Sequence, residues 1–547
     1  MQPNIPSASI FRYRVAMIGN PDTPDVRFDD AQLSRVKELG FTMVQLNIAW
    51  GTRPKDEALN LEDLLPLPGQ AETPEIAACR AELRRRANAC HAHGLRTLLH
   101  FGAPHVEKLY AQWHGAQQLE RTQRVEACLL LPETTQRYQA LLAALGESCP
   151  EIDDLLIYTS DQEAWLCGEF GECPRCAGVP LHERLPPFLQ ALRDGWARPT
   201  GTVWWEPWEL SAGQTLLMAA RIPAHNFGVM LHANIAEVQL ANTVDRWFRN
   251  MTRACAARGI PVIGEVFLSS TNDEMHPLFF PSPRLVYQEL TQLRLAPGIA
   301  GVKEYFGLLP DRDDPNLAMA GLCFADPAIS LDAALQQLAD PYQAAGAAML
   351  AAWQAAADGL ELFPWDVCWI LRYVGTMWNW HRWEEGYRIN GHLVDSPSWC
   401  STRRAHFMTT ENEELHPWFY EDMGLRCGLA SEQLEQALAE YARALPDLPS
   451  ARREAVKTWT RDMRTLKNNF SMLHCYILET LAARNIRMVK ASGREVDATL
   501  IARLRALLQL DADNHAGEPV PEGPLCFMEI LAAFDADPVG WAERHLL

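Results

Sequence analysis

The stretch Leu155–Gly178, LLIYTSDQEAWLCGEFGECPRCAG, decides how the rest of the chain is interpreted. It begins with an apolar run, LLIYT, which stops at the acids Asp161 and Glu163 and leads into a loop with three cysteines. A short apolar run bounded by turn residues is typical of a buried strand. In a barrel of parallel strands, the residues that follow each strand build the active-site face. We therefore interpret this stretch as the fourth strand of a (β/α)8 barrel, followed by catalytic carboxylates.

Seven further apolar runs have the same character, and amphipathic stretches of helical period separate most of them. Several of these stretches end at a glycine just before the next strand, as at Gly40 and Gly94, which is common helix C-cap chemistry. Eight strands joined by seven crossovers favour a closed (β/α)8 TIM barrel over an open sheet. The predicted strands are Arg14–Gly19, Phe41–Ala49, Arg96–Phe101, Leu155–Thr159, Thr202–Glu206, Phe227–His232, Pro261–Phe267 and Ile299–Tyr305.

After Tyr305 the sequence becomes mainly helical and rich in alanine. A chain of 547 residues is too long for one ordinary core, so a second domain is expected. We predict a catalytic barrel over residues 1–325 and an α-helical C-terminal region over residues 326–547, which covers or extends the barrel. The helix that closes the barrel is expected within Leu331–Asp366.

Composition limits the class of partner. The formal net charge is -20, with 69 acidic against 49 basic residues, which argues against a general surface for nucleic acid or anionic membrane. The chain begins without a signal-peptide pattern and contains no run of about 18 apolar residues. Its 14 cysteines lack the regular spacing of a small disulfide scaffold. We expect a cytoplasmic protein with reduced thiols and no nucleic-acid or membrane partner, and self-association stays open.

Acidic residues at strand ends are the candidate catalytic groups. Cleavage of a glycosidic bond needs one carboxyl to protonate the leaving oxygen and another as nucleophile, base or charge stabiliser. We expect Glu163 to be the general acid/base and Glu265, which interrupts an apolar strand, to be the nucleophile or base. Asp161 and Glu304 form a reserve pair. The alternative for each single acid is a structural role, such as capping a loop.

Aromatic and polar side chains at the same strand ends are the candidate substrate contacts. An aromatic ring can stack on the apolar face of a sugar, and an imidazole or carboxylate can bond its hydroxyls. The alternative for each tryptophan is hydrophobic packing against covering helices. The residues expected to bind substrate are Trp50, His100, Trp165, Trp205, Glu206, His232 and Tyr305.

The cysteine loop is a candidate structural zinc site. Its spacing is Cys167-x5-Cys173-x2-Cys176, and His182 follows six residues later. Three thiolates and an imidazole would form a closed tetrahedral site, which leaves no open position for chemistry. The other interpretation is a plain reduced loop, because the sequence has only one CxxC unit here. No cofactor is expected for the reaction itself.

Three parts of the sequence carry a resemblance: GFTMVQLNIAWG (Gly40–Gly51), IYTSDQEA (Ile157–Ala164) with its CGEFGECPRC loop, and the tryptophan-containing helical tail. They resemble a group of bacterial barrel hydrolases similar in layout to the family 20 hexosaminidases, the family 67 α-glucuronidases and the family 163 endo-acting hexosaminidases. In family 20 an adjacent Asp-Glu pair follows strand four, whereas here Gln162 separates the two acids.

The resemblance also extends to the large clan of retaining barrel hydrolases. There the acid/base follows strand four, commonly in an Asn-Glu pair, and the nucleophile lies at strand seven. Glu163 and Glu265 match those positions, with Gln162 in place of the Asn. The implied function is a glycosidase that acts on a small oligosaccharide or glycoside. Two alternatives stay open: a barrel hydrolase or lyase that cleaves another bond, with or without a metal, and a non-catalytic carbohydrate-binding barrel.

Overall fold

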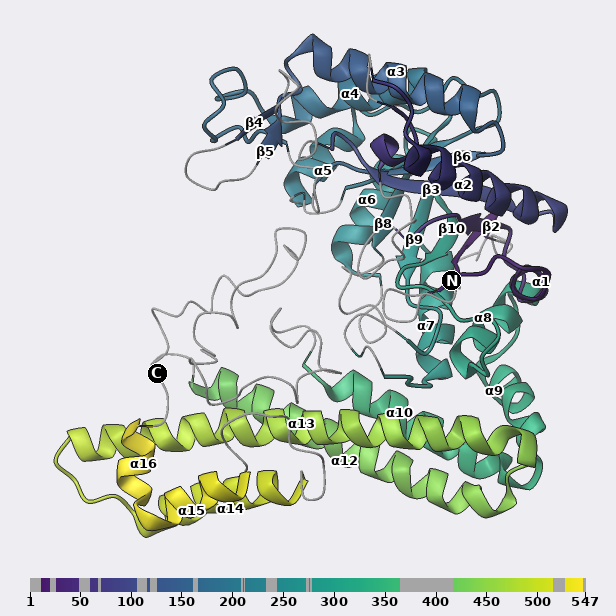
Figure 1. Ribbon diagram of the computed structural model, residues 1–547. Coiled ribbons are helices and arrows are strands. Elements are labelled where there is room, and N and C mark those ends of the chain that lie inside the picture. The colour runs from purple at the N-terminus through teal and green to yellow at the C-terminus, as the bar shows by residue number, and fades with distance from the viewer. Residues whose placement is uncertain are drawn as a thin grey trace, which may run out of the picture. The chain divides into compact units, whose positions relative to one another are not determined.

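The structure is a computed structural model that describes residues 11–19, 26–48, 60–66, 70–105, 116–118, 125–160, 166–207, 210, 212–232, 244–271, 275, 278–364, 417–514 and 527–544 (Figure 1). The chain divides into two compact units. The first unit holds the residues up to Ser269 together with Val286–Ser330, and the second holds Ser270–Leu285 and the described residues from Leu331 onward. The domain boundary predicted after residue 325 lies close to Ser330, but the segment Ser270–Leu285 groups with the second unit.

The first unit is a closed barrel of eight parallel strands, as the sequence predicts. The strands follow one another around the barrel in the order β1-β10-β9-β8-β7-β6-β3-β2, and β2 closes onto β1. Each strand overlaps one of the eight predicted runs. The strands are β1 (Tyr13–Met17), β2 (Met43–Gln45), β3 (Arg96–Gly102), β6 (Asp154–Tyr158), β7 (Val203–Glu206), β8 (Phe227–His232), β9 (Val262–Val266) and β10 (Ile299–Glu304).

Helices alternate with the barrel strands along the chain. They are α1 (Asp30–Glu38), α2 (Pro74–Ala92), α3 (Pro132–Ser148), α4 (Leu181–Trp196), α5 (Ala212–Ala219), α6 (Arg246–Ala256), α7 (Pro283–Arg294) and α8 (Pro315–Ala325). A 3-10 turn, Leu61–Asp63, precedes α2. The predicted C-cap glycines Gly40 and Gly94 both have positive φ, at 88° and 65°.

The helix that follows β10 begins earlier than the sequence analysis placed it. It is α8, which ends before the alanine-rich segment. Its start is set by Asp314, whose side chain accepts the N–H groups of Asn316 and Leu317 at 2.9 and 3.2 Å, and by Pro315 in the first turn. Proline is favoured there because its missing N–H would have no partner inside the helix. The Asp-Pro pair is therefore the signal that marks this helix start.

A layer of apolar side chains fills the interior of the barrel. Seven of the eight strands, all but β10, contribute one residue each: Val15, Met43, Leu98, Leu156, Trp204, Met230 and Ile263. Side chains two positions apart on a strand point to the same face. The residue two positions after each of these therefore also points inward, at the C-terminal end of its strand. This relationship positions the candidate site.

A short antiparallel hairpin that the sequence analysis did not predict lies in the connection between β3 and α3. Its strands are β4 (Ala116–Gln118) and β5 (Val125–Ala127). Ala127 also forms a parallel bridge with Leu166, which lies in the connection after β6. The hairpin thus ties together two loops at the C-terminal face of the barrel.

The second unit is helical in the part that the structure describes, in agreement with the predicted helical C-terminal region. The long helices α12 and α13 lie antiparallel, joined by a 3-10 turn (Leu445–Asp447) (Figure 1). No helix among the described residues is both long and apolar enough to cross a bilayer. The helical elements are α9 (Leu331–Ala339), a 3-10 turn (Asp340–Ala345), α10 (Gly346–Leu362), α12 (Pro417–Ala444), α13 (Ser450–Ala491), α14 (Ala498–Asn514), α15 (Phe527–Ala536) and α16 (Pro538–Arg544).

Candidate functional site

Five ionisable side chains form a second layer inside the barrel, directly above the apolar one. They come from five different strands, β3, β7, β8, β9 and β10, and all lie at or near the C-terminal ends of those strands. We call them the polar layer: His100, Glu206, His232, Glu265 and Lys303. All five are buried, with at most 7% of any residue exposed. Buried charges of this kind must be paired, and here they pair with one another.

Glu206 lies between two imidazoles. Its Oε1 accepts a hydrogen bond from Nε2 of His232 at 3.0 Å, and its Oε2 lies 3.0 Å from Nε2 of His100. Because a carboxylate only accepts hydrogen bonds, His232 carries its proton on Nε2. Burial alone would raise the pKa of Glu206, but the hydrogen bonds and charges of the two histidines lower it well below its ordinary value. Glu206 is therefore a fixed anion.

Glu265 lies between an ammonium group and an imidazole. Its Oε1 is 2.8 Å from Nζ of Lys303, and its Oε2 is 3.4 Å from Nε2 of His232. Lys303 is opposite Glu265 in the register of β10 and β9, so the two strands bring the charges together directly. Lys303 also donates to the carbonyl of Glu304 at 3.1 Å. The polar layer is thus continuous from His100 to Lys303.

Aromatic rings border the polar layer. Tyr305 meets His232 edge to face at 4.8 Å between ring centroids, and Tyr158 meets His100 in the same way at 5.4 Å. The Tyr158 ring fits only because its neighbour Gly102 lacks a side chain, since a Cβ there would come within 2.7 Å of the ring. These contacts restrict the orientation of both imidazoles.

A buried amide holds β2 to β3 beside the polar layer. The Asn47 side chain donates to the carbonyl of His100 at 2.7 Å and accepts the N–H of the same residue at 3.0 Å. Gln45 donates to the carbonyl of Asn47 at 2.7 Å. The sequence analysis named neither residue. Their signal was a pair of amides within the otherwise apolar run FTMVQLNIA, because a buried amide needs partners.

The structure brings together four of the predicted site residues, Glu265, Glu206, His100 and His232, and places Tyr305 beside them. Lys303 is a member that the sequence analysis did not name as a site residue. A lysine inside an apolar strand was its signal, because lysine is almost never buried without a partner. Four other predicted residues, Asp161, Glu163, Trp50 and Trp165, lie outside the described residues.

Glu304 does not join the polar layer, because strand alternation turns it to the outer face of β10. There its carboxylate accepts the N–H groups of Leu268, Phe306 and Gly307 at 2.7, 3.0 and 3.1 Å. Burial raises the pKa of Glu304 to about 7, although these bonds and Lys303 oppose the shift. Burial and the charge of Glu304 also raise the pKa of Glu289 on α7. These bonds tie the Glu304 carboxylate to the backbone that follows β9 and β10.

Trp205 is also turned away from the interior of the barrel. Its neighbour Trp204 belongs to the apolar layer, so alternation sends Trp205 to the outer face of β7. The side chain is fully buried, and its Nε1 donates to Oγ1 of Thr159 at 3.1 Å. Such a ring packs the barrel wall and is not available to stack on a sugar.

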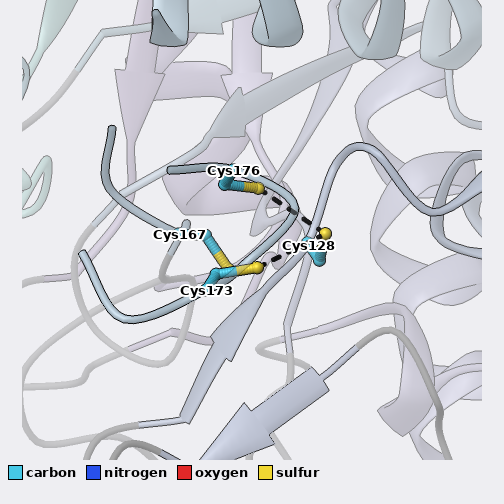
Figure 2. A group of neighbouring side chains, drawn as sticks. All are labelled: Cys128, Cys167, Cys173 and Cys176. Carbon is cyan, nitrogen blue, oxygen red and sulfur yellow. Dashed lines mark hydrogen bonds between the residues drawn. The ribbon is translucent and has the colours of Figure 1, made fainter. Parts of the chain in front are cut away.

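Two groups of side chains among the described residues could hold a metal ion. One is Glu206, His232 and Glu265, within the polar layer. The other consists of four buried cysteines, Cys128, Cys167, Cys173 and Cys176 (Figure 2). Three of these were predicted as zinc ligands together with His182. The fourth member of the group in the structure is Cys128, and His182 is not part of it.

The comparisons with known proteins connect this barrel to an enzyme fold. No protein-family model matches the sequence, and no curated protein matches it either. Among solved structures, the chain is similar to a GH138 enzyme targeting pectin rhamnogalacturonan II, with a TM-score of 0.65 over 97% of this chain and 67% of that one. The chain shares the fold of a glycoside hydrolase. The two sequences are 10% identical, so the likeness is one of fold.

A second solved structure aligned over most of the chain is a mutant O-GlcNAc hydrolase of Thermobaculum terrenum. It is also 10% identical, covering 97% of this chain and 98% of its own, with a TM-score of 0.46. Because both likenesses are at 10% identity, the argument for function rests on the polar layer.

Proposed function

We propose that the chain is a glycoside hydrolase that acts on a small oligosaccharide or glycoside at the C-terminal end of its barrel. The observation that carries this proposal is the buried carboxylate Glu265, held between Lys303 and His232 at the end of β9. Active sites of (β/α)8 enzymes are built at this end. A carboxylate fixed on two sides is also preorganised for attack or charge stabilisation.

In this proposal Glu265 is the nucleophile or base. The ammonium of Lys303 at 2.8 Å stabilises a negative charge on Glu265. An oxocarbenium-like transition state puts positive charge on the sugar ring, which an adjacent carboxylate stabilises. Lys303 and His232 would then keep Glu265 in position while the substrate changes its charge.

The proton donor must be a different acid from Glu206. A general acid has to hold its proton near the working pH, whereas the pKa of Glu206 lies far below that range because of His100 and His232. We assign Glu206 the role of orienting the two imidazoles. For the donor we propose Glu163, which follows β6, with Asp161 in reserve. Tyr158, which ends β6 five residues before Glu163 in the sequence, is opposite Glu206 in the strand register, and this relationship supports the choice.

A second candidate function is a metal-assisted hydrolase. The observation in its favour is that Glu206, His232 and Glu265 each offer a ligand atom within 4.8 Å of the others. Histidine and carboxylate ligands suit a divalent metal such as zinc. Against it, Lys303 and His100 already supply partners to both carboxylates. Elemental analysis of a Cys128→Ser and Cys176→Ser double variant separates the two, since a metal retained there would belong to the polar layer.

The experiment that tests the proposal is turnover of a panel of nitrophenyl glycosides and short oligosaccharides. We expect release of nitrophenol from at least one glycoside, without added metal. The matched measurement is sugar binding by calorimetry on the same preparation. Binding of sugars without turnover of any panel member would contradict the proposal and favour a non-catalytic carbohydrate-binding barrel.

A further inference from the structure

The four cysteines of the second group come from two separate loops. Cys128 directly follows β5, in the connection between β3 and α3, and the other three lie in the connection between β6 and α4. All four are buried, and their Sγ atoms lie within 4.8 Å of one another (Figure 2). We propose that Cys128, Cys167, Cys173 and Cys176 bind one zinc ion in a closed structural site.

The spacing of the sulfurs fits a tetrahedral zinc site. Zinc–sulfur bonds of about 2.3 Å at tetrahedral angles place neighbouring sulfurs about 3.8 Å apart. The Sγ of Cys128 lies 3.5 Å from that of Cys176 and 3.9 Å from that of Cys173. A disulfide would need about 2.05 Å, and none of these four described cysteines forms one. The group is therefore arranged around a common centre.

The backbone holds the four residues in this arrangement from both loops. The N–H of Cys167 donates to the carbonyl of Ala127 at 3.0 Å, which fixes Cys167 beside Cys128. In the Cys173-Pro174-Arg175-Cys176 segment, the N–H groups of Cys176 and Ala177 both donate to the carbonyl of Cys173, at 3.2 and 2.9 Å. This tight turn directs both of its cysteines to the same side.

A cationic donor contacts one of the four sulfurs. The Nε of Arg175 donates to Sγ of Cys128 at 3.3 Å. Four thiolates around Zn²⁺ leave a net charge of about -2, which a guanidinium partly offsets. Apolar packing of four cysteines would not need this guanidinium donor.

The site would act on structure and not on chemistry, because four protein ligands leave zinc no open position. It would join the hairpin loop after β3 to the loop after β6. Cys167 lies four residues after the proposed proton donor Glu163 in the sequence. The inference itself does not depend on the proposed function, since metal content is measured without substrate.

The test is metal analysis of the full chain, purified without a metal-affinity step and with a thiol reductant. We expect about one zinc ion per chain in the wild type, and loss of that zinc in Cys128→Ser and Cys176→Ser. Two controls should keep the metal: His182→Ala, which removes the imidazole first considered as a ligand, and Cys255→Ser, which alters a buried cysteine elsewhere in the barrel.

A spectroscopic measurement covers the case in which a cysteine variant fails to fold. Cobalt exchanged into the wild-type protein should give the intense visible absorption of a tetrahedral cobalt–thiolate site, and a mercurial reagent should release zinc as about four thiols react. A wild type that is free of metal after growth and refolding with zinc would overturn the proposal. Loss of zinc in His182→Ala, with retention in Cys128→Ser, would overturn the assignment of the fourth ligand.

Discussion

Nζ of Lys303 lies 2.8 Å from Oε1 of Glu265, and the two residues are direct neighbours in the register of β10 and β9. Both are 1% exposed. The parallel strands therefore fix the charged pair inside the barrel, where neither group can exchange its partner for water. Glu265 has only His232 as a further neighbour within ion-pair distance among the described residues.

Replacing Lys303 with methionine tests this pairing. The substitution keeps most of the length of the side chain and removes its charge, so it leaves Glu265 buried without its cation. Loss of one partner of a buried pair typically costs about 3–5 kcal/mol, and we expect a fall of this size in the free energy of unfolding. Urea denaturation followed by tryptophan fluorescence measures it.

The double variant Lys303→Met with Glu265→Gln provides the control for that prediction. It removes both charges, so its free energy of unfolding should fall by less than the sum of the two single changes. Additive effects of the single variants would show that the two side chains do not interact in solution.

The buried carboxyl of Glu304 should make the stability of the barrel depend on pH. Its folded pKa of about 7 lies above the ordinary value of 4.5. Between these values the folded chain holds a proton on Glu304 that the unfolded chain has released. The contribution of Glu304 to the free energy of unfolding is therefore highest at low pH and falls as pH rises toward 7. The fall from this group is about 3 kcal/mol. Glu304→Gln cannot ionise and should lack this part of the pH dependence.

The measurement is the free energy of unfolding of the wild type and Glu304→Gln at about pH 5 and about pH 8. The difference between the two curves reports Glu304 together with the part of the Glu289 titration that depends on the charge of Glu304. Parallel curves would contradict the raised pKa.

The barrel could be predicted from the sequence because each strand is a short apolar run, and the stretches between most strands repeat their apolar residues at the period of a helix. All eight predicted runs overlap a strand of the structure, Leu155–Thr159 with β6 for example. The hairpin β4–β5 escaped prediction because each of its strands has three residues, too few to show alternation. Cys128 follows that hairpin, so the fourth cysteine of the group could be found only in the folded chain.

The face of each strand could not be predicted. Strands of a parallel barrel are buried on both sides, so their sequences read as continuous apolar runs without a polar face. Alternation puts Lys303 and Glu304 on opposite faces of their strand, yet it does not tell which of them points inward. The same ambiguity affected Trp204 and Trp205. Glu265 could be placed because a single acid in an apolar strand needs a polar surrounding, which the interior of the barrel supplies.

The proposed proton donor can be tested through the leaving group of the substrate. Dinitrophenolate leaves without protonation, whereas an alkoxide does not. Glu163→Gln should therefore hydrolyse a dinitrophenyl glycoside at nearly the wild-type rate and an alkyl glycoside about 100- to 10,000-fold more slowly. Asp161→Asn is the matched control and should change both rates alike. An equal loss by Glu163→Gln on the two substrates would argue against a role in protonation.

The rate of Glu265→Gln on the best substrate of the panel tests the central claim most directly. The amide keeps the size of the side chain and removes its charge, so we predict a loss of kcat on the order of 10⁴-fold on activated and unactivated substrates alike. Glu304→Gln, the same change on the outer face of the neighbouring strand, should keep wild-type kcat. Full activity in a folded Glu265→Gln protein would contradict the account.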